Sequence, residues 1–149
     1  MVRLAAALVC LALAGCGEDD PPLDVTCRES PDAIVRALDG VPGPVALASG
    51  TRLSQCVSRA ASDAQLQSVG VVLTDASELL ARRAETGDER AALQLGYLAG
   101  AVRRGAARTG GVHAELERRI GRAGAFLDAA GARVEQALLR GLRAGEARG

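Results

Sequence analysis

The stretch SDAQLQSVGVVLTDASELLARRA, residues 62–84, carries the pattern that sets the fold class. Its apolar residues recur every three or four positions, as they do along one face of an α-helix. Ser62 and Gln65 have the spacing of a capping box at a helix N-terminus. We therefore expect a helix from about Asp63 to Ala84, whose apolar face is formed by Leu66, Val69, Val72, Leu73, Ala76, Leu79 and Leu80.

The next stretch, TGDERAALQLGYLAGAVRRGA (residues 86–106), predicts a second long helix. Asp88 is its expected N-cap, and the helix should run from Glu89 to about Ala107. Charges at both ends of the segment disfavour a membrane-type helix dimer. Small residues spaced by four let a neighbouring backbone approach closely, so we expect tight packing inside the domain. These small residues are Ala92, Gly96 and Gly100.

Two shorter helices are predicted closer to the N-terminus. Ser30-Pro31-Asp32 supplies an N-cap, a proline at the first helical position and an acid in the first turn of a helix that ends near Gly40. Residues 41–44 form a turn-rich connector. Ser49-Gly50-Thr51 then opens a helix whose apolar face holds Leu53, Cys56 and Val57.

The C-terminal part predicts a long, interrupted helical segment. Gly110-Gly111 breaks the chain, and a helical period continues from Val112 to about Arg143. Glycine is unfavourable in a helix interior, so a kink or a break is expected near Gly131, which leaves one helix or two open. The tail after Ala144 is expected to fray. In all, the sequence predicts an all-α fold, a small bundle of four or five helices in one domain spanning residues 26–149.

The first sixteen residues have the organisation of an export signal. Arg3 gives a positive start, and Leu4 to Leu13 form an apolar run too short to span a membrane. The run ends in Leu13-Ala14-Gly15-Cys16, which resembles the lipobox of bacterial lipoproteins. The resemblance implies that residues 1–15 are a cleaved signal peptide and that Cys16 becomes an N-terminus modified with diacylglycerol, with chains such as palmitate. It also implies export and anchoring to the extracytoplasmic face of a bacterial membrane.

Two alternatives to lipidation stay open. An uncleaved anchor needs about twenty apolar residues, but the apolar run stops before the acidic Glu18-Asp19-Asp20. A secretory signal cut after Ala12-Leu13-Ala14 leaves the position of Cys16 unexplained. With lipidation, Cys10 is discarded with the signal, and the acidic, proline-containing residues 16–25 form a lipidated tether that stays solvated.

The remaining cysteines, Cys27 and Cys56, are expected to pair as a disulfide. An oxidising compartment favours such a bond. On the chain-entropy model, closing the loop between Cys27 and Cys56 stabilises the folded state by about 3.5 kcal/mol. The spacing does not match a Cys-x-x-Cys redox motif, and no further Cys or His lies nearby to complete a zinc site.

Residues suited to catalysis or to metal binding are sparse. His113 is the single histidine, which disfavours a di-metal carboxylate site and a serine triad. His113-Ala114-Glu115 resembles part of the zinc deaminase motif, but the companion Cys-x-x-Cys is missing. We therefore expect a non-catalytic protein without cofactor or metal, and a solvent-exposed His113 at a helix N-terminus.

Charge is unevenly distributed, although the net charge is zero and every basic residue is Arg. Residues 17–40 are acidic and residues 82–149 are basic. Six arginines flank the predicted break at Gly110-Gly111 and form a candidate basic patch for anionic headgroups or envelope polymers. The alternative that these are ordinary helix-surface charges stays open, because Glu115 lies four residues before Arg119. The six residues are Arg103, Arg104, Arg108, Arg118, Arg119 and Arg122.

Two function classes remain. The first is a membrane-anchored interaction or scaffold module that binds a protein or an anionic envelope polymer. The second is a carrier of a small apolar or lipid ligand, which requires a cavity lined by Leu and Val. Nucleic acid is disfavoured as a partner, because the net charge is zero and aromatic residues are nearly absent.

Overall fold

The computed structural model describes residues 21–109, 113–125 and 127–149. The predicted signal peptide, Cys10, Cys16, the first part of the tether, the Gly110-Gly111 break and Phe126 lie outside these residues. The described part contains helices and no strands, which confirms the predicted all-α fold. Its α-helices are α1 (Pro31–Ala37), α2 (Leu53–Ser58), α3 (Asp63–Glu85), α4 (Glu89–Ala106), α5 (Ala114–Ala123) and α6 (Ala132–Arg148). Short 3-10 helices are η1 (Val25–Arg28), η2 (Leu38–Gly40), η3 (Ala107–Thr109) and η4 (Leu127–Ala130).

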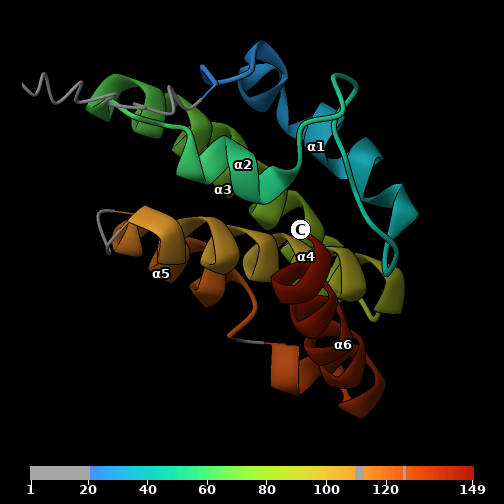
Figure 1. The fold of residues 1–149 in the computed structure, drawn as a ribbon. Coiled ribbons are helices and arrows are strands. Elements are labelled where there is room, and N and C mark those ends of the chain that lie inside the picture. The colour runs from blue at the N-terminus through green and yellow to red at the C-terminus, as the bar shows by residue number, and fades with distance from the viewer. Residues whose placement is uncertain (1–20, 110–112, 126) are drawn as a thin grey trace, which may run out of the picture.

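The central element is α4, which contacts α2, α3, α5 and α6. In Figure 1 it runs across the middle of the molecule, with α1, α2 and α3 above it and with α5 and α6 below it. Among the described helices, none combines the length and the apolarity needed to cross a membrane. The core is built around α4, the helix whose glycine spacing predicts close packing.

The predicted helix starts are largely confirmed by their hydrogen bonds. The Asp88 side chain accepts bonds from the backbone N–H groups of Arg90 and Ala91, and the Ser30 hydroxyl accepts one from Ala33. The capping box of α3 is formed in part. The Ser62 hydroxyl accepts from the Gln65 backbone, but the Gln65 side chain accepts from Ala61 rather than from Ser62.

The second short helix begins later than the sequence suggests. α2 starts at Leu53, and its N-cap residue is Arg52, whose backbone N–H donates to the Gln55 side chain at 2.9 Å. The Ser49 hydroxyl, expected to open this helix, instead accepts from the Thr51 backbone in the preceding turn. The reason is local: the Gln55 side chain satisfies the first free backbone donor, so no serine cap is needed.

The closest helix pair is α4 and α6, which meet backbone to backbone. A Cβ placed on Gly96 would lie 2.0 Å from the carbonyl oxygen of Leu138, and one on Gly145 would lie 2.1 Å from that of Tyr97. Gly100 and Gly141 are equally crowded by the opposite backbone. The expected tight packing inside the domain is confirmed, and α6 is the neighbour that the small residues of α4 admit.

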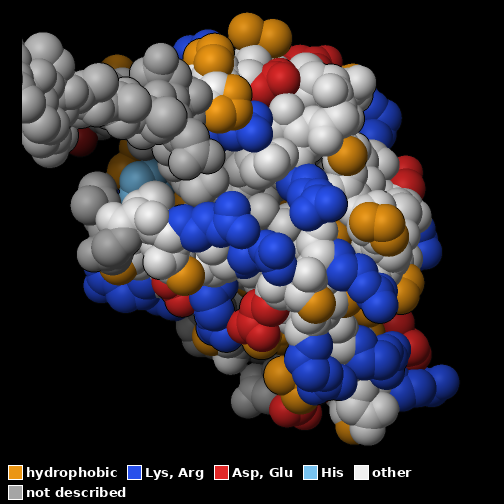
Figure 2. Space-filling model, viewed as in Figure 1, with side chains coloured by type: hydrophobic (Ala, Val, Ile, Leu, Met, Phe, Trp, Pro, Cys, Tyr) orange, Lys and Arg blue, Asp and Glu red, His pale blue; other side chains and the backbone are white. Residues whose placement is uncertain are grey.

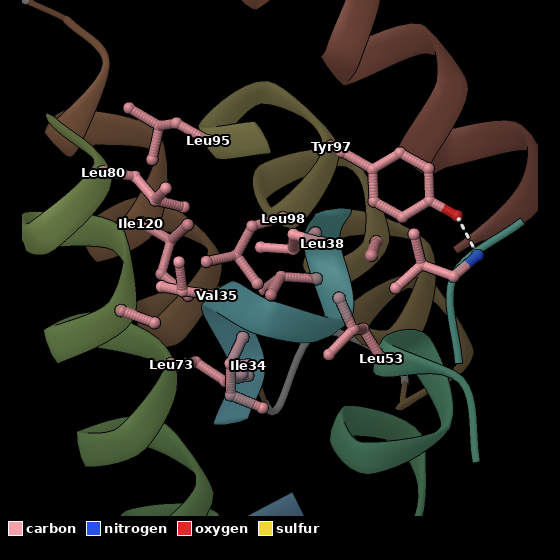
Figure 3. Packing of buried hydrophobic residues seen from close by; sticks show 14 of the residues in the cluster. Ile34, Val35, Leu38, Leu53, Leu73, Leu80, Leu95, Tyr97, Leu98 and Ile120 are labelled. Atoms are coloured by element: carbon pink, nitrogen blue, oxygen red, sulfur yellow. Dashed lines mark hydrogen bonds between the residues drawn. The ribbon is translucent and has the colours of Figure 1, made fainter. Parts of the chain in front are cut away.

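The interior is filled by aliphatic side chains from every α-helix. Figure 3 shows Leu38, Leu53, Leu73 and Leu98 converging beside α4. Tyr97 is fully buried, and its hydroxyl accepts a hydrogen bond from the Val45 backbone N–H at 3.1 Å. Burial raises the pKa of the Tyr97 hydroxyl above its usual value. Tyr97 thus packs in the core, as predicted.

The final segment divides into α5, η4 and α6. Gly131 is the N-cap of α6 with φ of +107°, a conformation that side chains rarely tolerate, so the predicted break at Gly131 is confirmed. The prediction that the tail frays after Ala144 is wrong. α6 continues to Arg148, and its last carbonyls, of Glu146 and Ala147, each accept a 2.8 Å bond from Arg104 Nη1. The Ser54 hydroxyl holds the carbonyl of Gly149 at 2.6 Å.

Candidate binding cleft

A cleft of about 460 Å³ lies between α3 and the start of α5. Its apolar wall comes from Leu66 and Val71 of α3 and from Leu116 of α5. Val71 is 55% exposed, and it is one of only three large apolar side chains exposed in the described part of the chain. The volume is within the range of small-molecule and short-segment binding sites. The cleft is therefore the first candidate site in this fold.

The sequence produces the cleft through a difference in helix length. α3 has 23 residues and α5 has only 10, so α5 covers part of one side of α3. The core face of α3, which includes Val69 and Leu73, is fully buried. The neighbouring ridge contains Gly70, where an added Cβ would still lie 3.7 Å from the Leu116 side chain. A missing side chain at Gly70 and a short covering helix together leave a hollow.

His113 lies in the wall of this cleft, and its placement corrects the sequence analysis. The residue is the N-cap of α5, as expected, but its side chain is only 5% exposed rather than solvated. Among the described residues, neither ring nitrogen has a hydrogen-bond partner. Helix position alone suggested exposure, whereas the tertiary fold buries the side chain. Burying a polar group without a partner lowers the stability of the fold by about 1–3 kcal/mol. The imidazole of His113 therefore either destabilises the domain or gains its missing partner from a ligand.

The cleft carries an excess of negative charge. Asp63, Asp75 and Glu115 line it together with Arg119. Glu115 forms ion pairs with Arg118, Arg119 and Arg122, and its Oε1 accepts from Arg119 Nε at 2.9 Å, which confirms the predicted i,i+4 pair. Of these arginines, Arg119 is the one among the described residues that line the cleft, where it balances the charge of Glu115. Within the described part of the chain, Asp63 and Asp75 have no ion-pair partner. The uncompensated charge of the site therefore comes from two carboxylates.

The six arginines of the candidate basic patch are divided among separate interactions. Arg103 bridges Glu117 of α5 at 3.2 Å and Glu146 of α6 at 2.7 Å, and the bond to Glu146 raises its pKa. Arg104 holds the end of α6, and the three arginines of α5 surround Glu115. Among the six, Arg108 is the exposed one that makes no hydrogen bond or ion pair to the described residues.

The arginines visible on one face of the molecule are also spread out. Figure 2 shows Arg side chains in several groups across the α4 and α6 region, with acidic side chains between some of them. Nonlocal pairing with Glu117 and Glu146 consumes charges that looked free in the sequence. We therefore build the functional proposal on the cleft and not on these arginines.

The cysteine pair and the chain before it form a second ordered region. The sulfur atoms of Cys27 and Cys56 are joined, with Cα atoms 5.5 Å apart, so the predicted pairing is present. Leu23 is buried and Asp24 accepts bonds from Thr26 and Thr51, so two residues expected in the solvated tether pack on the domain. The hydrogen bonds from Thr26 lower the pKa of the Asp24 carboxyl to about 2. The lipid-attachment candidate Cys16 lies outside the described residues.

Val71 is the one sequence signal that could have indicated the cleft. It lies outside the apolar face predicted for residues 62–84, and apolar surface on a solvent-facing side can mark a contact site. In the described residues, no group of three or more His, Cys, Asp and Glu side chains is arranged to hold a metal ion. No protein-family model, curated protein or solved structure matches this chain.

Proposed function

We propose that this protein is a lipid-anchored, non-catalytic interaction module that binds a protein partner in the cleft between α3 and α5. The single observation that carries the binding role is that one cleft combines an apolar wall with the buried, unpartnered imidazole of His113. The lipobox-like Leu13-Ala14-Gly15-Cys16 supports the anchor, and the Cys27–Cys56 pair is consistent with an oxidising compartment. The anchored domain would present its cleft at the extracytoplasmic face of a bacterial membrane.

A non-catalytic role is supported by the chemistry of the cleft. Its wall holds one imidazole and several carboxylates, and the imidazole has no hydrogen bond to a Ser, Thr or Asp of the described chain. Nucleophilic catalysis requires a base within hydrogen-bonding reach of the nucleophile. Binding requires only that apolar and polar groups face a common hollow, as they do here.

The anchor and the binding role are tested separately. For the anchor, wild type and Cys16→Ala are expressed in a bacterial host, fractionated and weighed by intact mass spectrometry. Wild type is expected in membranes as a diacylated chain beginning at Cys16, and the variant is expected to lose both the lipid and the membrane association. An unmodified Cys16 in a wild-type chain would contradict the anchor.

For the binding role, a photo-crosslinking amino acid is placed in living cells at Val71, in the cleft, and at Leu139, on α6. Both side chains are exposed apolar residues, at 55% and 43%, so Leu139 is the matched control. Crosslinks to a defined protein are expected from position 71 and not from position 139, and Leu66→Glu should abolish them. Equal crosslinking from both positions, or crosslinks that survive Leu66→Glu, would reject the cleft as the binding surface.

A carrier of a small apolar ligand is the second candidate, and the Leu66, Val71 and Leu116 wall favours it. The rest of the core is filled by side chains, so such a ligand would lie in an open cleft. Organic extraction of the purified chain, followed by mass spectrometry, distinguishes the two. A carrier would release a stoichiometric lipid that is absent from Leu66→Glu, whereas an interaction module would release no stoichiometric lipid, because its own anchor is covalently attached to Cys16.

A further inference from the structure

We infer that the partner inserts a segment in which aliphatic side chains are flanked by Lys or Arg. This inference rests on the proposed function, because it names the chemistry of the partner that the α3–α5 cleft receives. It follows from three features of the cleft wall: the apolar residues, the two uncompensated carboxylates and the buried imidazole.

The apolar wall selects aliphatic side chains. Leu66, Val71 and Leu116 offer branched aliphatic surface, and among the described residues no Phe, Tyr or Trp lines the cleft. Leu116 is buried while Val71 is largely exposed, so the wall runs from the domain interior to the surface. A Leu, Ile or Val side chain from a partner would cover Val71 and remove apolar area from water.

The carboxylates select cations beside that aliphatic group. Asp63 and Asp75 are twelve positions apart on α3, which corresponds to about 18 Å along the helix axis. Glu115 is paired with Arg119, the arginine among the described lining residues, so these two together add no net charge to the cleft wall. Asp63 also stabilises the N-terminus of α3, but Asp75 lies in mid-helix without an ion-pair partner among the described residues. Basic side chains at both ends of the partner segment complement this arrangement.

The imidazole of His113 supplies a polar contact in the buried part of the cleft. A neutral imidazole donates through one ring nitrogen and accepts through the other. A peptide segment brings both a backbone N–H and a carbonyl, so it can satisfy either nitrogen. An acyl chain brings neither along its length, and an anionic polymer would face Asp63 and Asp75. The three features therefore agree on a basic, aliphatic peptide segment.

The test uses two synthetic peptides and the full chain purified from bacterial membranes in a nonionic detergent. The probe is acetyl-KALLAK-amide, and acetyl-EALLAE-amide has the same apolar residues with reversed charge. Binding is followed by the NMR shifts of the backbone amides of Gly70, in the cleft, and Gly141, in the α4–α6 interface. We expect the basic peptide to shift Gly70 and not Gly141, and to bind about tenfold more tightly than the acidic peptide.

Variants of the carboxylates separate site binding from general charge attraction. Asp63→Asn and Asp75→Asn are each expected to weaken the basic peptide about fivefold. Glu85→Gln is the matched control, because Glu85 is an exposed acid of the same helix outside the cleft. The affinity of this variant for the basic peptide should stay within about twofold of that of wild type. His113→Leu should weaken binding several-fold while the domain remains folded, which a purely structural histidine would not do.

Three outcomes would overturn the inference. The first is equal binding of both peptides, and the second is equal loss of affinity in Glu85→Gln and Asp75→Asn. The third is self-association of the chain, seen by analytical ultracentrifugation and abolished by Asp75→Asn, because the cleft would then receive a second copy. If the peptides fail to bind while crosslinks from position 71 persist, the proposed function stands and only the partner chemistry is rejected.

Discussion

The α4–α6 interface and the α3–α5 cleft differ in how closely the two helices of each pair pack against each other. In the first, glycines let the backbones approach until an added Cβ would lie about 2 Å from a carbonyl oxygen. In the second, a Cβ added at Gly70 would lie 3.7 Å from the Leu116 side chain, an ordinary contact distance. His113 is buried there without a hydrogen bond to the described residues. The contrast is between one helix pair packed backbone to backbone and another that leaves Val71 exposed and, among the described residues, His113 without a hydrogen-bond partner.

The largest expected effect compares glycines from the two regions. Gly96→Ala places a Cβ 2.0 Å from the Leu138 carbonyl oxygen, so we expect the free energy of unfolding to fall by about 3 kcal/mol. Gly70→Ala is the matched change in the cleft, where the nearest atom is 3.7 Å away, and it should raise stability by about 0.5–1 kcal/mol because Ala favours the helix. Urea unfolding of both variants measures the difference. Equal effects would remove the distinction between the two regions.

The next effect concerns the buried hydroxyl in the core beside α6. Tyr97→Phe leaves the backbone N–H of Val45 without its acceptor, so stability should fall by about 2 kcal/mol. The ring volume is kept, which separates the lost hydrogen bond from a packing defect. Urea unfolding at neutral pH gives the value, and an unchanged midpoint would show that the Val45 N–H finds another acceptor.

The corresponding change in the cleft should have the opposite sign. His113→Leu removes a buried group without a hydrogen bond and keeps an apolar side chain, so stability should rise by about 1 kcal/mol. The gain is measured by thermal unfolding of the unliganded chain. A loss of stability would mean that His113 contributes to the fold, and it would weaken the case for a group reserved for a ligand.

A smaller, local effect is expected at the end of α6. Arg104→Met removes two hydrogen bonds to the carbonyls of Glu146 and Ala147, which should destabilise the last turn by about 1 kcal/mol without unfolding the domain. Faster amide hydrogen exchange confined to the last turn of α6 is the expected observation. Arg108→Met removes an exposed arginine that makes no contact of this kind with the described residues, so it should leave exchange unchanged.

The smallest effect is expected at Asp24, which lies away from both regions and serves as a reference. The pKa of Asp24 is lowered from 3.8 to about 2, so its ionised form stabilises the folded state. This contribution is complete above about pH 4 and is lost as pH falls through about 2. The difference in stability between wild type and Asp24→Asn should therefore shrink between pH 5 and pH 2. A difference that stays constant over this range would contradict the lowered pKa.

The helices and most of their ends follow from local patterns in the sequence. The period of residues 62–84 predicted α3 to within one residue, and Asp88 and Ser30 cap α4 and α1 as expected. These features were predictable because capping bonds and helical periods join residues three or four positions apart. The small residues of α4 also predicted close packing with a neighbouring helix, although they did not identify that helix as α6.

The neighbours of each helix, and with them the candidate site, depend on the tertiary structure. His113 is buried although its helix position suggested exposure, and the order of the last turn of α6 depends on Arg104 and Ser54, which are more than forty positions away. Arg103, which looked free in the sequence, meets Glu117 and Glu146 from other helices. Local patterns carry no information about such contacts, because each is fixed by how whole helices pack and not by the spacing of residues within one helix.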